Sequence, residues 1–376
     1  MVHDGYTDLL YVLLPLWQAE FALGYATLAT LRALYAGSMA GLQWPASRLA
    51  ERLGNRALLA LGTLCAAAGF MVAGLSGSLA GLAFGLVLSG CGSSTQHPLA
   101  SATVSRAYGG DARRALGTYN FSGDVGKAAF PGALALLLTV MTWRHALWIM
   151  AAVGIAVAAG LACFVPGGTL RPAAHAEDGG GTGTDVRGFS ILLTLGVLDT
   201  SVRMGLLLFL PFLLKEKGAS LAAIGFSFSL LFCGGAAGKF LCGWLGARVG
   251  VIRTVLVTES GTAACIGALL YLPLPLAVAL LPVLGIMLNG TSSVLYGSVP
   301  VLTPPHRTER AFAVFYTAVI GSGALAPVVY GALGDRLGVA DATMATAVTA
   351  LATLPLAFAL GPHLSKGYAG PSIGVA

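Results

Sequence analysis

Charged side chains lie inside long apolar stretches of this sequence, where ionic groups are costly. Asp124 and Lys127 are three residues apart, and Asp199 and Arg203 are four residues apart, so each pair shares one face of a helix. Arg32 lies near the middle of another apolar stretch. A charge at the centre of a membrane span costs about 2.5–3.5 kcal/mol on insertion scales, so it normally faces a water-filled cavity and has a partner. The pattern therefore predicts a polar cavity within an apolar helical protein.

The carboxylates of this set are candidates for proton transfer. A carboxylate beside a cation in a low-dielectric pocket can exchange a proton, because desolvation favours the neutral acid while the cation favours the charged form. We expect Asp124 and Asp199 to carry protons, with Asp4 and Asp8 on a shared face of the first apolar stretch as further candidates. Whether Asp124 pairs with Lys127 or with another helix is open. The alternative is that these pairs only hold helices together.

The cations of the set are candidates for binding an anionic group, since arginine can hold one in bidentate fashion. Polar side chains in the same predicted helices could contact a substrate, although ordinary packing between helices explains them equally well. His97 is a candidate because histidine side chains normally titrate near neutral pH, but a lone membrane histidine is often only hydrogen-bonded to a neighbouring helix. The predicted substrate-binding residues are Arg32, Lys127, Arg203, Tyr11, Tyr119, Asn120 and His97.

The composition excludes an ordinary soluble domain. Of the 376 residues 56% are hydrophobic and only 10% are charged, against roughly 25% charged in soluble domains. A soluble protein of this length could not cover its surface with so few polar groups. The six cysteines fall inside apolar stretches without metal-binding spacing, so we expect neither a metal nor disulfides. The basic residues, which give a net charge of +6, stand singly in short loops, which is typical of a topology signal and not of nucleic-acid binding.

About twelve stretches have the roughly 20 mostly apolar residues that a membrane span requires. The fold class predicted is therefore an all-α membrane protein with about 12 transmembrane helices. Pro98 and Pro131 predict kinks in two of them. The predicted spans are 4–22, 24–46, 57–76, 79–103, 114–140, 144–165, 189–214, 219–243, 252–272, 276–302, 311–332 and 339–361.

The basic residues also predict the orientation. If both termini are cytoplasmic, thirteen of the 21 Lys and Arg residues lie in cytoplasmic loops and four lie outside. Cytoplasmic loops are normally the richer in these residues. No basic segment precedes the first apolar stretch, so we expect no cleavable signal peptide. The expected location is the inner (plasma) membrane of a bacterium, with multiple spans.

The sequence repeats at an offset of 196 residues. The matching positions are Pro15 and Glu20 with Pro211 and Glu216, 47–54 with 243–250, Arg114 with Arg310, and Pro131 with Pro327. Several matches at one spacing predict two pseudo-repeated six-helix bundles. The predicted domains are residues 1–165, a cytoplasmic linker at 166–188, and residues 189–376.

The segment between the second and third spans resembles a known signature. Ser47-x-Leu49-Ala50-Glu51-Arg52-x-Gly54-x-Arg56 resembles GxLxDRxGxR/K of the major facilitator superfamily, with Ser for the first Gly and Glu for Asp. This resemblance implies the major facilitator fold, with substrate bound near the membrane midplane. It also implies that Glu51, Arg52 and Arg56 form a conformational latch that stabilises an outward-open state.

A narrower resemblance rests on the first half of the chain. The motifs are Asp4-x-Tyr6, Leu14-Pro15-Leu16-x-Gln18-x-Glu20-Phe21, Gly90-Cys-Gly-Ser-Ser-Thr-Gln-His-Pro98, and Gly123-x-x-Gly126 with Pro131. They are similar to the fosmidomycin-resistance branch of the superfamily, which implies drug-extruding antiport driven by protons. Asp124 and Lys127 depart from that branch, where these positions are normally neutral and small, and this leaves the exact drug open. Glu259 lies in a helix that is usually peripheral in the superfamily, so a gating or structural role is expected for it.

We therefore expect a proton-coupled exporter of a small anionic or zwitterionic compound. The alternatives are a proton symporter that imports a small carboxylate or phosphonate, and a membrane sensor that does not transport. The sequence contains no Walker lysine loop, HExxH or GxSxG motif, so we expect no enzyme and no cofactor. The expected partners are a small-molecule substrate, protons and the lipid bilayer, without nucleic acid, and the chain is expected to act as a monomer.

Overall fold

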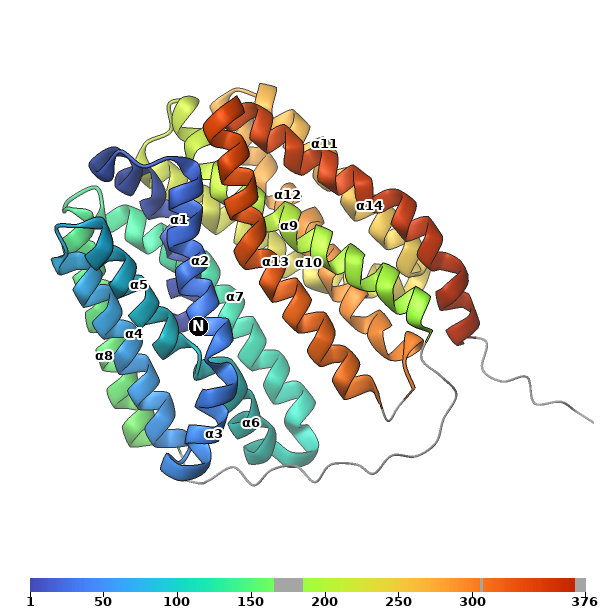
Figure 1. Cartoon of the computed structure of the whole chain (residues 1–376), viewed down its shortest axis with the longest axis horizontal. Coiled ribbons are helices and arrows are strands. Elements are labelled where there is room, and N and C mark those ends of the chain that lie inside the picture. Colours follow the sequence, from blue (N-terminus) through green and yellow to red (C-terminus); the bar gives the residue numbers. More distant parts are fainter. Residues whose placement is uncertain (166–184, 305–306, 369–376) are drawn as a thin grey trace, which may run out of the picture. The chain divides into compact units, whose positions relative to one another are not determined.

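All regular secondary structure in the described part of the chain is helical. The computed structural model describes residues 1–165, 185–304 and 307–368, and within these ranges it contains no strand. Most of the predicted linker, residues 166–184, lies outside the described residues. The chain divides into two compact units, which are described separately: unit 1 is Met1–Ala173 with Leu210–Cys233, and unit 2 is Ala174–Phe209 with Gly234–Ala376. Figure 1 labels the helices in chain order.

The first half of the chain forms most of the helices of unit 1. These are α1 (Val2–Phe21), α2 (Tyr25–Gly41), α3 (Gln43–Leu53), α4 (Asn55–Leu75), α5 (Leu79–Ser93), α6 (Gln96–Tyr108), the short η1 (Gly109–Asp111), α7 (Ala112–Leu137) and α8 (Trp143–Phe164). Within the unit, α4 packs against α5 and α8, α1 packs against α7, and α2 packs against α5.

The predicted continuous helix at 24–46 is interrupted. α2 ends at Gly41, and α3 begins at Gln43. Pro45 is the third residue of α3 and has no N–H group, so it cannot donate a hydrogen bond to the carbonyl of Gly41, four residues earlier. The chain therefore leaves the direction of α2 at Leu42 and begins a separate helix.

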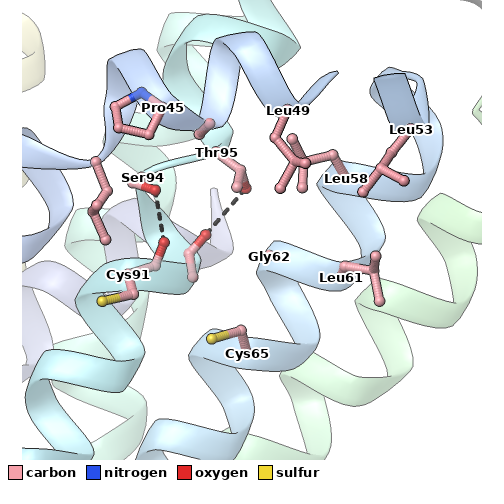
Figure 2. Close-up of a pocket in the computed structure, with 13 residues that line it drawn as sticks. Pro45, Leu49, Leu53, Leu58, Leu61, Gly62, Cys65, Cys91, Ser94 and Thr95 are labelled. Carbon is pink, nitrogen blue, oxygen red and sulfur yellow. Dashed lines mark hydrogen bonds between the residues drawn. The ribbon is translucent and has the colours of Figure 1, made fainter. Parts of the chain in front are cut away.

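The predicted helix at 79–103 is broken near its expected kink. Pro98 is the third residue of α6 and cannot donate to the carbonyl of Ser94, and the helix is interrupted at Ser94 and Thr95. The Ser94 hydroxyl donates to the carbonyl of Cys91 at 2.6 Å, and the Thr95 hydroxyl donates to that of Gly92 at 3.0 Å (Figure 2). α7, in contrast, continues through Pro131 without a break.

The second half of the chain forms α9 to α14. These are α9 (Val186–Glu216), α10 (Leu221–Val249), α11 (Val251–Tyr271), α12 (Leu274–Leu302), α13 (Thr308–Leu337) and α14 (Val339–Tyr368). α9 begins three residues before the predicted span, because the Asp185 carboxylate accepts a hydrogen bond of 2.9 Å from the Gly188 N–H and so caps the helix. The end of α9 and the first half of α10 belong to unit 1, where Phe228 stacks on Tyr11 with ring centroids 5.6 Å apart.

Length and hydropathy alone identify eight of the described helices, α4 and α8 to α14, as able to cross a membrane. The other predicted spans fall short for visible reasons. α2 has 17 residues and α5 has 15, because their spans are broken, and a crossing needs about 20 residues. α1 and α7 carry the charged residues discussed above. Each predicted span nevertheless corresponds to one helix or one broken helix, which confirms the predicted fold class.

The repeat found in the sequence is also visible in the structure. α11 packs against α12 and α14 of unit 2, as α4 packs against α5 and α8 of unit 1. Gly54 precedes α4 with φ 81°, and Gly250 precedes α11 with φ 92°. The two glycines are 196 residues apart, and both adopt a positive φ that favours glycine. The loop geometry is thus repeated together with the helix packing.

Close packing of α4 on α5 depends on small residues. A Cβ atom added at Gly85 would lie 2.7 Å from the backbone nitrogen of Ala73, closer than real side chains approach. Small residues at such positions let membrane helices approach each other closely. Any larger residue at Gly85 would therefore have to push α4 and α5 apart.

Candidate functional site

The Asp4 carboxylate joins three elements of unit 1. Its Oδ1 atom lies 3.9 Å from Lys127 Nζ on α7 and 3.9 Å from His97 Nε2 on α6, and the Asp4 side chain is 13% exposed. A Cβ atom added at Gly123 would lie 3.0 Å from Asp4 Oδ2, so this glycine gives the carboxylate room against α7. One predicted proton carrier therefore lies with two predicted substrate-binding residues. Asp124, one helical turn before Lys127, is half-buried on α7.

Arg32 is buried in unit 1 and lies over an aromatic ring. Its guanidinium carbon is 4.4 Å from the centroid of the Tyr11 ring, a cation–π contact. The Arg32 side chain is 4% exposed, and its Nε atom has no hydrogen-bond partner among the described residues. Asp8, one turn before Tyr11 on α1, is also buried. The structure therefore places these predicted site residues on adjoining parts of α1 and α2.

A histidine that sequence analysis did not select lies at the centre of a buried network in unit 1. His3 Nδ1 is 3.0 Å from the Ser93 hydroxyl, and His3 Nε2 is 3.0 Å from the Thr63 hydroxyl. Thr63 already donates its own hydroxyl proton to the Leu59 carbonyl, so His3 Nε2 is the donor in that bond. The Ser93 hydroxyl also contacts the Tyr35 hydroxyl at 3.1 Å. The network joins α1, α2, α4 and α5.

In unit 2, Asp199 and Arg203 are connected through a third side chain. The Ser292 hydroxyl donates to Asp199 Oδ2 at 3.0 Å and accepts from Arg203 Nη1 at 3.2 Å. Arg203 Nη1 also donates to the Asn289 amide oxygen at 3.3 Å. Arg203 Nε is buried and has no hydrogen-bond partner among the described residues. The predicted pair on α9 is therefore organised by α12, which brings neutral oxygens to the arginine.

Glu259 on α11 is a part of this cluster that the sequence did not indicate. Its side chain is 2% exposed, and that of Asp199 is 5% exposed. The two carboxyl groups are in hydrogen-bonding contact, and Glu259 also contacts the hydroxyls of Thr291 and Thr353. An ionised carboxylate can only accept hydrogen bonds. A hydrogen bond between two carboxyl groups therefore requires that one of them holds a proton.

The repeat offset relates the two buried networks. Adding 196 to the positions of His3, Thr63 and Ser93 gives Asp199, Glu259 and Asn289. His3 contacts Thr63 and Ser93, and Asp199 contacts Glu259. The offset, applied to Asp199, would have selected His3. Applied to the partners of His3, it would have selected Glu259. The 196-residue offset is present in the sequence, but it selects His3 and Glu259 only once the contacts within unit 1 or unit 2 are known.

The remaining predicted site residues are half-buried or exposed. Tyr119 lies close enough to Asp4 to interact with its charge. Tyr119 is half-buried and packs against the cluster that contains Leu99, whereas Asn120 is exposed on α7. The three predicted latch residues are exposed, Glu51 and Arg52 on α3 and Arg56 on α4. Their predicted roles remain predictions.

An apolar pocket lies beside the two broken helices of unit 1. It has a volume of about 340 Å³ and is lined mainly by leucines of α3 and α4, with the thiols of Cys65 and Cys91 at one side (Figure 2). Ser94 and Thr95, at the break between α5 and α6, form part of its wall. None of the predicted substrate-binding or proton-carrying residues lines this pocket. It is therefore separate from the charged cluster around Asp4.

Solved transporter structures have the same fold as this chain. A bacterial homolog of the human lysosomal transporter Spinster, in an inward-facing and occupied conformation, aligns with a TM-score of 0.81 and 19% identity over 97% of this chain and 95% of that one. A POT family transporter in complex with a thioalcohol-conjugated peptide aligns with a TM-score of 0.76 and 13% identity over 97% of this chain and 95% of that one. The nucleoside transporter NupG, in mutant form, aligns with a TM-score of 0.75 and 14% identity over 96% of this chain and 98% of that one. At these identities the likeness concerns the fold.

Sequence comparison gives the family. No curated protein matches the chain significantly. The family model described as Major Facilitator Superfamily matches residues 2–319 and again residues 192–371, so the second match covers most of the second repeat. These matches extend over most of the chain and agree with the helical fold, which is that of a multi-pass membrane protein. The chain belongs to the Major Facilitator Superfamily.

Proposed function

We propose that the chain is a proton-coupled secondary transporter that exports a small anionic or zwitterionic organic compound by alternating access. Its family and its transporter-like fold support transport in general. The motifs of α1, α5, α6 and α7 that resemble the fosmidomycin-resistance branch support export of a drug-like compound. The distribution of Lys and Arg supports the inner membrane with both termini in the cytoplasm.

The preference for an anionic group rests on two arginines, of which Arg32 is buried and Arg203 is half-buried. Arg32 in unit 1 and Arg203 in unit 2 each keep a buried Nε without a hydrogen-bond partner among the described residues. A buried donor without a partner costs about 1–3 kcal/mol, and more when it is charged. Arg203 reaches the Asp199 carboxylate only through the Ser292 hydroxyl, and Arg32 lies on the Tyr11 ring, so a carboxylate, phosphonate or phosphate of a substrate would supply the acceptor that each Nε lacks.

Proton coupling is supported by the buried acids. Asp4 lies between Lys127 and His97, Asp8 is buried one turn before the Tyr11 ring that Arg32 covers, and Asp199 lies in the network of Arg203. Each of these carboxyl groups is removed from bulk water and is close to a basic group. This is the setting in which a change in water access or in the neighbouring charge can shift a proton on or off.

A symporter that imports a small carboxylate or phosphonate would use the same residues. Alternating access is reversible, and the direction depends on how proton and substrate binding are ordered. A membrane sensor would need no substrate-linked proton movement at all. The three functions are therefore distinguished by measuring transport.

The experiment uses the purified chain in proteoliposomes that contain a trapped pH-sensitive dye. The test compounds are small anions, phosphonates including fosmidomycin, and common cationic drugs. The wild type is compared with Asp124→Asn and with Asp341→Asn, a control at an exposed carboxylate on α14. We expect an anionic or zwitterionic compound to move protons in the wild type and in the control. Loss of this movement in Asp124→Asn would assign the coupling to Asp124.

The other outcomes are also informative. Coupling that survives in Asp124→Asn would shift the proton site to Asp4, Asp199 or His97. Proton movement driven only by cationic drugs would contradict the anionic preference. Uptake of a radiolabelled compound without any proton movement would show a uniporter or another driving ion, and would contradict proton coupling.

A further inference from the structure

The hydrogen-bonded contact between Asp199 and Glu259 brings two acids together where water is largely excluded. The side chains are 5% and 2% exposed, and they come from different helices, α9 and α11. Two negative charges at hydrogen-bonding distance in a low-dielectric interior repel each other strongly. Such a pair titrates as one unit and holds one proton over a wide pH range, as two carboxyl groups that share a site cannot both ionise easily.

The groups around the pair favour a single proton. From α9 the pair faces Arg203, which reaches Asp199 through the Ser292 hydroxyl. From α12 it faces Thr291 and the Tyr296 phenol, and from α14 it faces Thr353. One positive charge compensates one negative charge, so a pair with one proton leaves this part of unit 2 close to neutral. A second negative charge would have no compensating cation among these facing groups.

Unit 1 shows independently that these two repeat positions meet. His3 and Thr63, the residues at the positions of Asp199 and Glu259, form a hydrogen bond of 3.0 Å. The contact is therefore a property of the repeated packing of the two helices. Where unit 1 has a titratable histidine and a neutral hydroxyl, unit 2 has two carboxyl groups. A group able to exchange protons is present at this place in both units.

We propose that Asp199 and Glu259 share one proton, and that this pair takes up and releases the proton during transport. Glu259 thereby becomes a proton-carrying residue on a helix for which only a gating or structural role was expected. The second part of this proposal rests on the proposed proton-coupled transport, while the first part, the shared proton, stands on the geometry of unit 2.

The shared proton is tested by infrared spectroscopy of the full chain in membranes. A protonated carboxylic acid has a carbonyl stretching band that an ionised carboxylate lacks. We expect the wild type to show such a band at neutral pH. In Glu259→Gln and in Asp199→Asn we expect the band to lose the intensity that one protonated carboxylic acid contributes. In Glu259→Gln the amide donates to Asp199, so this carboxyl group ionises. Glu216→Gln, at an exposed position of α9, is the matched control and should keep the full band.

The result that overturns the shared proton is a band unchanged in Glu259→Gln, provided that the variant elutes as a folded protein with wild-type helicity. Absence of the band in the wild type at neutral pH would overturn it as well. A second variant, Glu259→Asp, retains a carboxyl group and should retain the band, which separates the effect of the proton from that of a packing defect.

The transport role is tested with the same variants in proteoliposomes. We expect Glu259→Gln to lose substrate-driven proton movement while exchange of labelled for unlabelled substrate across the membrane continues. Proton movement at the wild-type rate in Glu259→Gln would overturn the role in coupling. If the wild type itself moves no protons, the proposed function fails, and the infrared result still decides whether the pair shares a proton.

Discussion

Lys127 and Asp4 connect the first and the seventh helix of unit 1, with 3.9 Å between the ammonium nitrogen and Oδ1 of the carboxylate. The same carboxylate lies 3.9 Å from His97 on α6. Local spacing had paired Lys127 with Asp124 on its own helix, and the structure adds a partner more than one hundred residues away in the chain. Lys127 thus belongs to a cluster that spans three helices.

Replacing Lys127 tests this cluster. In Lys127→Ala the carboxylate of Asp4 loses a cation in a site where its side chain is only 13% exposed. Lys127 is itself about one-third exposed, so we expect a modest loss of about 1 kcal/mol in stability and a reduction in transport rate of tenfold or more. Lys127→Arg keeps the charge and should retain most of the rate. Thermal unfolding and initial transport rates measure the two effects, and an unchanged rate in Lys127→Ala would contradict a role in transport.

Replacing Ser292 tests the bridge between Asp199 and Arg203. The hydroxyl donates to Asp199 and accepts from Arg203, so Ser292→Ala leaves both groups less well positioned. A hydrogen bond to a charged group contributes about 1.5–3 kcal/mol, and about 1.4 kcal/mol corresponds to a factor of ten. We expect the KM for the transported anion to rise about tenfold. The control is Ser293→Ala on the same helix, and equal KM values in the two variants would argue against the bridge.

Replacing Glu20 tests the contact between the end of α1 and the start of α8. The Glu20 carboxylate accepts hydrogen bonds from Arg144 and from the Trp143 indole, the latter at 2.6 Å, and so ties α1 to the start of α8. The pair is about one-third exposed, so we expect Glu20→Gln to lower stability by about 1 kcal/mol. The repeat-equivalent Glu216 is exposed, and Glu216→Gln should leave the unfolding temperature unchanged. Thermal unfolding of both variants in detergent measures the difference between their unfolding temperatures, which should become smaller at high salt.

Replacing Gly85 tests the close packing of α4 and α5. A Cβ atom there would lie 2.7 Å from the Ala73 backbone nitrogen. Gly85→Val must push the helices apart, at a cost of about 1–3 kcal/mol. Gly160 on α8 has open space around it, so Gly160→Val is the matched control. The fraction of protein that elutes as a single folded species should fall only in Gly85→Val. A similar fall in both variants would indicate a general intolerance of valine.

The predicted orientation is tested by labelling from each side of the membrane. In a variant without native cysteines, Arg56→Cys should react with a membrane-impermeant thiol reagent only from the cytoplasmic side. Lys215→Cys should react only from the other side. Both residues are exposed in the structure, so access is not limited by burial within the chain. The reverse pattern would invert the topology and reject cytoplasmic termini.

The sequence by itself determined the spans and the repeat. Whether a segment crosses a membrane depends on about 20 consecutive residues, so the information is local and survives without any knowledge of packing. The positions of most helices follow from it within a few residues. Pro98 also indicated the distortion near the break between α5 and α6, because a missing N–H group is a local property of the residue. Pro45 carried the same signal for α2 and α3.

Only the tertiary structure decided which polar groups meet. Asp4 with Lys127, His3 with Thr63 and Asp199 with Glu259 are contacts between helices far apart in sequence. A helix can present a charged residue to several neighbours, and which one it faces depends on how the helices cross and rotate. Spacing along one helix therefore predicted pairs on α7 and on α9, but it could not predict the contacts with Ser292 or with Glu259. Helix packing brought Glu259 to Asp199, and the low dielectric of the interior is what makes that contact require a proton.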